Sequence, residues 1–282
     1  MIPPRLYPAL DLSWPAMPAD ETVERLLAAL DAASPTAAEP HPRGIRVFFA
    51  TPADRRRAAG EARAFDPSLS IAAHDVSDES WAERSQTALT PVSIGRLTIA
   101  PPWSPAVDGG IWITIQPSMG FGTGHHQSTR LCLGVLQTLS LAGRSVIDVG
   151  TGSGVLAIAA ARLGARPVLG LDGDADALAA ARENVERNLS EGGVTLRQAE
   201  LGRDALPPGT ACDVLLANLT GATLVRLAPL LTAAVVAQGA LIVSGLQDAE
   251  RDEVLAAFAL AGARLDRDVA EDDWLALLLR RL

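Results

Sequence analysis

The sequence contains no lysine, and all 24 of its basic residues are arginine. Its two cysteines, Cys132 and Cys212, lie far apart and form no C-x-x-C pair, so neither a disulfide framework nor a zinc knuckle is indicated. Aromatic residues make up only 4% of the chain. No apolar run reaches the roughly 18 residues of a membrane-spanning helix. We therefore expect a soluble protein with no membrane association.

Positive charge is also in deficit, since the formal net charge is −9 at pH 7. Nonspecific binding to nucleic acid depends on Lys and Arg displacing counterions from phosphates, so we expect no direct nucleic-acid binding. A basic protein partner suits this charge better. The first residues lack the charged, apolar and small-residue segments of a signal peptide, and we expect a cytoplasmic protein.

What is present, from residue 145 onward, is a regular alternation of short apolar runs and helix-like runs. Such alternation predicts an α/β fold, with a parallel sheet covered by helices on both faces. Strands are expected at 145–150, 167–172, 194–200, 212–218 and 239–245, and helices at 154–164, 175–188, 222–235 and 248–262. Residues 263–282 predict two more strands separated only by "EDD", which makes this last pair antiparallel.

The front of the chain has a different pattern. Strands are expected at 5–14, 44–51 and 68–76, with helices at 19–33 and 52–65, which indicates a small α+β domain. A further strand would belong at "SPTAAEPHPR", residues 34–43, but its prolines and few β-formers disfavour one. We expect a small domain over residues 1–80, a linker over 81–110 and a larger domain over 111–282.

The stretch "VIDVGTGSG" places Gly150, Gly152 and Gly154 between an apolar strand and a helix. Glycine permits positive φ and close ligand approach, and the helix N-terminus offers free N–H donors. This pattern predicts a nucleotide-like ligand. It also loosely fits the fingerprint of dinucleotide-binding proteins, so an NAD-dependent dehydrogenase stays an alternative here.

Two acidic residues help to choose between the cofactors. Asp172 ends the next strand, where a carboxylate accepts hydrogen bonds from ribose hydroxyls in either ligand. Asp148 stands just before the glycine turn, where it would repel a pyrophosphate but attract an α-ammonium group. This pair favours S-adenosylmethionine over NAD, with S-adenosylhomocysteine as product.

Asn218 ends the strand in "CDVLLANLTG". Ligands bind beyond the carboxyl ends of strands in open parallel sheets, so Asn218 is expected beside the reacting end of the cofactor. Its amide oxygen accepts a hydrogen bond from a neutral amine and orients the nitrogen lone pair. Methyltransferases of planar nitrogens often carry N-P-P-Y here. The residues Asn-Leu-Thr-Gly lack that aromatic ring, which favours a flexible aliphatic amine.

Several motifs occur together in one order: "SMGFGTGHHQSTRLCL", "VIDVGTGSGVLAIAA", "GLDGD", "LLANLTG", "RLAPLL" and "LIVSGLQD". With them the chain resembles the ribosomal protein L11 methyltransferase family over about residues 81–282. The resemblance implies a ferredoxin-like substrate-recognition domain followed by a class I methyltransferase domain with a seven-stranded, mostly parallel sheet and an antiparallel closing strand. It implies S-adenosylmethionine-dependent methylation of the α-amine and lysine ε-amines of ribosomal protein L11.

The resemblance also assigns site residues. By it, the cofactor-contacting positions are Thr129, Gly150, Asp172 and Asn218, the loop above the methyl group holds Phe121, Gly122, Thr123, Gly124 and His126, and Gly152 and Gly154 complete the turn. Gln127 and Ser128 depart mildly from the family pattern. The prolines of residues 34–43 are a further departure, in the domain to which the resemblance assigns substrate recognition.

The adjacent histidines His125 and His126 point in different directions and have no third ligand nearby in sequence, so a metal site is disfavoured. A flap is the better interpretation, in which Phe121 covers the sulfonium and Thr129 hydrogen-bonds the cofactor. A general-base role for His126 stays open but is not required.

We hypothesise in-line transfer of a methyl group to a deprotonated amine, aligned by Asn218. Three alternatives remain at this stage: a class I methyltransferase acting on another protein or a small-molecule amine, a module that binds the cofactor without turnover, and an NAD-dependent oxidoreductase.

Overall fold

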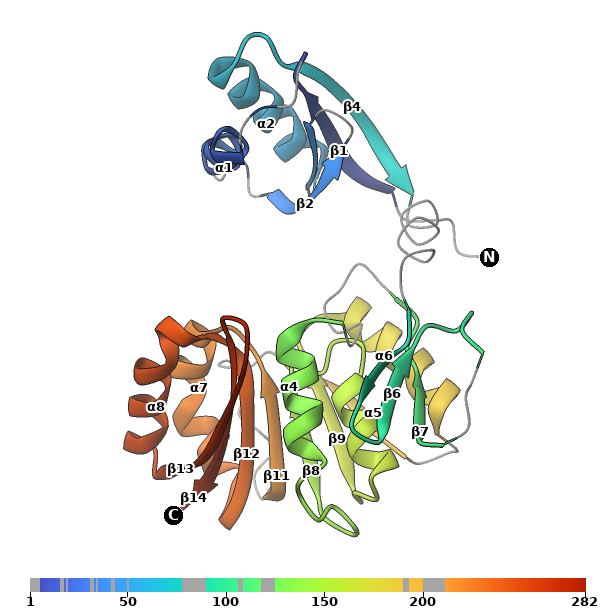
Figure 1. Cartoon of the computed structure of the whole chain (residues 1–282), viewed down its shortest axis with the longest axis vertical. Helices are drawn as coiled ribbons and strands as arrows, with labels where there is room; N and C mark the ends of the chain where they lie inside the picture. The colour runs from blue at the N-terminus through green and yellow to red at the C-terminus, as the bar shows by residue number, and fades with distance from the viewer. Residues whose placement is uncertain are drawn as a thin grey trace. The chain divides into compact units, whose positions relative to one another are not determined.

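The chain folds into two compact units, Met1–Ala88 and Leu89–Leu282 (Figure 1). The computed structural model describes residues 6–15, 18, 20–30, 33, 35–41, 44–49, 51–77, 90–105, 109–117, 125–189, 193–199 and 211–282.

The smaller unit is a four-stranded antiparallel sheet with two helices packed on one of its faces. Its elements are β1 (Leu6–Ser13), α1 (Asp20–Ala29), β2 (Pro35–His41), β3 (Gly44–Phe49), α2 (Pro52–Phe65) and β4 (Ser70–Ser77), with strand order β2-β3-β1-β4. Alternate residues of β1 and β3, such as Leu10, Leu12 and Val47, join Leu26 and Ala58 of the helices in one buried cluster. This βαββαβ arrangement confirms the expected ferredoxin-like fold.

Strand β2 corrects the sequence-based expectation for residues 34–43. It contains Pro35 and Pro40, yet it pairs antiparallel with β3 along its length. The physical reason is its place at the edge of the sheet, because one side of an edge strand has no neighbour that requires its N–H groups.

The larger unit contains the expected seven-stranded sheet. Its strands are β8 (Val146–Val149), β9 (Val168–Asp172), β10 (Thr195–Gln198), β11 (Cys212–Asn218), β12 (Val235–Gln247), β13 (Ala263–Glu271) and β14 (Trp274–Arg281), in the order β10-β9-β8-β11-β12-β14-β13. The pairs from β10 through β12 are parallel, whereas β14 runs antiparallel to both β12 and β13. The predicted fold class is thereby confirmed.

Helices cover both faces of this sheet. The elements are α4 (Gln127–Leu136), α5 (Val155–Arg162), α6 (Ala175–Asn188), α7 (Gly221–Ala233) and α8 (Arg251–Leu260), with the short 3-10 turn η2 (Asp248–Glu250) before α8. Helices α4 and α5 contribute to one apolar core, and α7 and α8 contribute to another. Such two-sided burial explains why β11 and β12 are apolar nearly throughout.

A three-stranded sheet formed by β5 (Val92–Ile94), β6 (Leu97–Ala100) and β7 (Ile111–Thr114) packs into the same core as α4 and α5, through Leu97, Ile99 and Ile113. Strands β5 and β6, which fall within the expected linker, therefore belong to the larger unit, and Leu97 and Ile99 of β6 lie in its core. Within the described residues, no helix combines the length and apolar character needed to cross a membrane.

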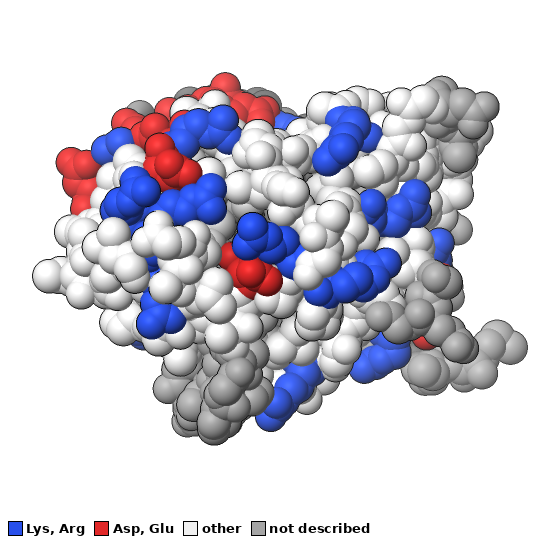
Figure 2. Space-filling view, turned by 90° about the horizontal axis from the view of Figure 1, so that it is seen from below, with Lys and Arg blue, Asp and Glu red and all other residues white. Residues whose placement is uncertain are grey.

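Basic side chains spread over the face where the parallel strands begin, while acidic side chains gather mostly toward one side of the view (Figure 2). On the side of the larger unit where the parallel strands begin, three arginines donate hydrogen bonds to backbone carbonyls in the last turns of helices. Arg166 reaches Ala161, Arg162 reaches Asn188, and Arg281 reaches Ala233, each at 3.1 Å. Helix C-termini carry partial negative charge, so these arginines stabilise the ends of α5, α6 and α7.

Candidate functional site

The glycine turn between β8 and α5 uses left-handed backbone at each of its three glycines. The φ angles are +71° at Gly150, +53° at Gly152 and +82° at Gly154, which is the N-cap of α5. A Cβ atom at Gly150 would lie 2.6 Å from Leu219 Cδ2. Residues with a side chain rarely adopt this backbone conformation, so these positions favour glycine.

Asp148 lies on β8 just before this turn, and 1% of its surface is exposed. One carboxylate oxygen, Oδ2, accepts hydrogen bonds from Thr151 Oγ1 at 2.7 Å and from the backbone N–H of Ala157 at 3.1 Å. The other oxygen, Oδ1, is buried with no partner among the described residues. Burial raises the pKa of Asp148 to about 6. A buried acceptor without a partner is costly, so this oxygen is suited to receive a cationic donor.

Asp172 ends β9 and faces the same turn. Its carboxylate accepts the backbone N–H of Gly152 at 2.9 Å and that of Asp174 at 3.0 Å. Asp174 in turn caps α6 by accepting the N–H of Asp176 at 2.9 Å. The Asp172 side chain is thereby fixed beside the turn by backbone donors, and it stays partly exposed.

Asn218 ends β11, where it pairs with Ser244 of β12. Its amide nitrogen donates to Thr129 Oγ1 at 3.3 Å, across 89 residues of sequence. Thr129 lies in the first turn of α4 and is 2% exposed. The bond to Thr129 uses the amide N–H, which leaves Asn218 Oδ1 as the acceptor.

Gly245 helps to keep that acceptor uncovered. Its φ is +85°, and a Cβ atom there would lie 3.0 Å from Asn218 Oδ1 and 2.4 Å from the carbonyl oxygen of Leu219. The register of β12 against β14 shifts at this point. Gly245 was not singled out by the sequence analysis, although "VSG" at the end of a predicted strand was a usable signal.

His126 is the N-cap of α4. Its Nδ1 accepts the backbone N–H of Ser128 at 3.3 Å and lies 2.8 Å from Ser128 Oγ. Its ring meets Trp274 edge to face, with 4.5 Å between centroids. Burial, followed by the nearby charge of Arg130, lowers the pKa of His126. The neutral ring is therefore favoured, with Nδ1 occupied as a helix cap.

The structure brings together Asp148, Gly150, Gly152, Gly154 and Asp172 at the carboxyl ends of β8 and β9, and Asn218 and Thr129 at the neighbouring end of β11. The predicted flap residues Phe121, Gly122, Thr123 and Gly124 lie outside the described residues. Across the parts of the chain that are described, no group of three His, Cys, Asp or Glu side chains is arranged to hold a metal ion.

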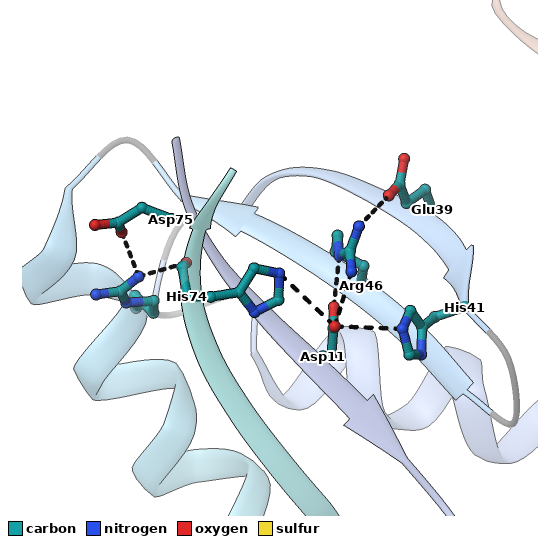
Figure 3. Close-up of polar contacts among 7 residues, drawn as sticks. Asp11, Glu39, His41, Arg46, His74 and Asp75 are labelled. Carbon is teal, nitrogen blue, oxygen red and sulfur yellow. Dashed lines mark hydrogen bonds and ion pairs between the residues drawn. The ribbon is translucent and has the colours of Figure 1, made fainter. Parts of the chain in front are cut away.

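A separate polar cluster lies in the smaller unit, centred on Asp11 (Figure 3). Arg46 donates to both carboxylate oxygens of Asp11, at 2.5 and 2.8 Å, and to Glu39 at 3.3 Å. The Nε2 atoms of His41 and His74 lie 3.2 and 3.7 Å from Asp11 Oδ2. Burial acts to raise the pKa of Asp11, but the hydrogen bonds and charge of Arg46 lower it overall. These contacts link all four strands of the sheet.

Comparison with known proteins agrees with the geometry. Residues 29–282 match the family described as ribosomal protein L11 methyltransferase (PrmA). Among the curated relatives that bear the name ribosomal protein L11 methyltransferase, two show the extent of the match. The protein of Chloroflexus aurantiacus is 38% identical over 236 residues, which cover 75% of this chain and 72% of the relative. That of Geobacter sulfurreducens is 45% identical over 208 residues, which cover 73% of this chain and 67% of the relative.

A solved structure indicates the same family. The crystal structure of ribosomal protein L11 methylase from Lactobacillus delbrueckii subsp. bulgaricus aligns with a TM-score of 0.60 and 28% identity, covering 69% of this chain and 99% of that one. The family match spans most of the sequence, and it includes every described residue of the glycine turn and the Asn218–Thr129 pair. The chain therefore belongs to the ribosomal protein L11 methyltransferase family.

Proposed function

We propose that this protein methylates ribosomal protein L11, at its α-amine and at lysine ε-amines, with S-adenosylmethionine as the methyl donor. The methyl donor and the reaction class follow from the family and the fold. The protein substrate is that of the named relatives, and the alternative of a small-molecule amine is not favoured. The substrate would be met in the cytoplasm.

The residues around the glycine turn fit this cofactor. Asp148 Oδ1, buried and without a partner, would accept the α-ammonium of the methionyl group. Asp172, held by two backbone N–H groups, would accept the ribose hydroxyls. The positive φ angles at Gly150, Gly152 and Gly154 leave space for close approach between them. When bound, S-adenosylmethionine supplies an activated methyl group.

The single observation that supports amine chemistry is the orientation of the Asn218 side chain. Because its N–H is donated to Thr129, Asn218 Oδ1 would accept a hydrogen bond from an amine and align the nitrogen lone pair. A carboxylate at this place would instead stabilise the charged ammonium form, which has no lone pair to react.

The reaction requires a neutral amine more than it requires a strong base. A lysine ε-amine has a pKa near ~10.4 in water, and burial beside positive charge would lower this pKa towards neutrality. The Asn218 side chain hydrogen-bonds Thr129, and His126 uses Nδ1 to cap α4. Asn218 would therefore hold the amine, and water would take each proton before the next transfer.

Intact-mass spectrometry tests the proposal. Unmethylated recombinant ribosomal protein L11 is incubated with the enzyme and S-adenosylmethionine, and we expect mass increments of whole methyl groups. A parallel reaction uses L11 with an acetylated N-terminus, which isolates transfer to lysine. Peptide mapping then assigns the amines. An L11 that gains no mass, while S-adenosylmethionine binds by calorimetry, would refute the substrate but leave the cofactor site standing.

A further inference from the structure

The start of α4 is joined to the distant β13–β14 turn by three side-chain contacts. His126 packs edge to face on Trp274, with 4.5 Å between ring centroids. Gln127 donates to Asp272 at 3.3 Å, and Arg130 Nε donates to both carboxylate oxygens of Glu271, at 3.0 and 3.2 Å. The last two contacts span 145 and 141 residues of sequence.

Thr129 lies inside this clamped segment. It is one residue before Arg130 and three after His126, and its buried hydroxyl accepts the amide N–H of Asn218. The backbone N–H groups of Thr129 and Arg130 both donate to the carbonyl of His126, at 3.1 Å. A shift of the first turn of α4 would therefore move the hydroxyl that accepts the Asn218 N–H.

We propose that Trp274 and Glu271 are positioning residues for methyl transfer, which fix the first turn of α4 and through Thr129 set the orientation of the Asn218 amide. This inference rests on the proposed function, because it concerns the same site. Among the described residues, neither side chain forms a hydrogen bond with Asn218. Their effect acts through the hydrogen bond between Thr129 Oγ1 and Asn218 Nδ2, because a misplacement of the reacting atoms by about 1 Å can slow a reaction ~100-fold.

A purely structural role for this turn predicts something different. The Arg130–Glu271 pair is partly exposed, at 24% and 38% of the two side chains, and pairs of this kind contribute little to stability. Trp274 is only partly buried against the core, so it contributes less burial than a core tryptophan would. If the turn only completes the sheet, its substitution lowers the melting temperature and leaves the rate of the folded enzyme unchanged.

Steady-state kinetics of three variants separates the two roles. Trp274→Leu removes the aromatic partner of His126, Trp274→Phe keeps one, and Arg280→Gln breaks the Arg280–Asp266 pair elsewhere in the same hairpin. With saturating L11, we expect Trp274→Leu to lower kcat ~10-fold while the Kd for S-adenosylhomocysteine changes less than ~3-fold. Trp274→Phe should retain most of the wild-type kcat, and the kcat of Arg280→Gln should equal that of the wild-type enzyme.

A second readout does not depend on activity. In hydrogen exchange, Trp274→Leu should speed exchange at the amides of Thr129 and Arg130, and leave the first turn of α6 as in wild type. Wild-type kcat in Trp274→Leu, or unchanged exchange at these amides, would overturn the inference. So would equal losses in Trp274→Leu and Trp274→Phe. If the wild-type enzyme itself transfers no methyl group to L11, the proposed function fails. The exchange experiment still tests whether the β13–β14 turn fixes the first turn of α4.

Discussion

The two halves of the proposed site are built in different ways. The proposed cofactor half contains Asp148, Gly150 and Asp172, and the side-chain hydrogen bonds of its two aspartates span at most 20 residues. The proposed transfer half contains Asn218, Thr129 and the β13–β14 turn, whose contacts span 89 to 148 residues. Local backbone geometry makes the first half, and tertiary packing makes the second. The two halves should therefore respond differently to substitution.

The largest expected effect is in the transfer half. Asn218→Ala removes the acceptor that orients the amine, and we expect kcat to fall ~100-fold or more, because alignment of the reacting atoms is lost. The Kd for S-adenosylhomocysteine should stay within a few-fold of wild type. Single-turnover kinetics together with calorimetry measures both. A variant with wild-type kcat would refute the role of Asn218. A large loss of cofactor affinity would show that Asn218 also belongs to the cofactor half.

The cofactor half should respond to pH through Asp148. Burial raises the pKa of its carboxyl to about 6, so the folded protein without cofactor keeps the proton at pH values where the unfolded chain has lost it. The free energy of unfolding should therefore decrease as pH rises from the usual carboxyl range to about 6. Binding of an α-ammonium needs the ionised form, so affinity should rise ~10-fold between pH 5 and 7 and level off above.

Calorimetry across that pH range tests this prediction, with Asp148→Asn as the control. The control should bind the cofactor more weakly at pH 7 and show no such pH dependence. Equal affinity of the wild-type protein at pH 5 and 7 would contradict a contact between Asp148 and the ammonium.

A smaller effect is expected at the glycine turn. Gly150→Ala places a Cβ at φ +71° and 2.6 Å from Leu219 Cδ2, so we expect a cost of at least about 1 kcal/mol and a loss of cofactor affinity of about fivefold or more. The kcat at saturating cofactor should change less than the KM for S-adenosylmethionine. A variant in which kcat falls while KM is constant would show that the turn also controls alignment.

The smallest effect tests a residue that supports the cofactor half without entering it. Asp174→Ala removes the N-cap of α6, and we expect a loss of about 1 kcal/mol in the free energy of unfolding with little change in kcat. Denaturant titration measures the free energy of unfolding, and the methylation assay measures kcat of the same variant. Unchanged stability would indicate that the side chain does not cap the helix in solution.

The sequence predicted more of the cofactor half than of the transfer half. Residue type alone predicts positive φ at Gly150, Gly152 and Gly154. Asp172 could be predicted because it ends the next apolar run. Asn218 could be placed at a strand end by periodicity, but its partner Thr129 was assigned only through the family resemblance. Trp274 had no sequence signal, since nothing local connects it to His126. Strand β2 was disfavoured for its prolines, because the sequence does not reveal which strand lies at the edge.

By itself, the sequence determined the alternation of strands and helices, the antiparallel final pair and the left-handed glycine turn. These follow from hydrophobic period, turn length and the conformational freedom of single residues, all of which act over short distances along the chain. Only the tertiary structure decided that Asp148 retains a buried oxygen without a partner, that Thr129 holds Asn218, and that the β13–β14 turn holds α4. Those features depend on which distant segments pack together, because burial and contact are set by the whole fold.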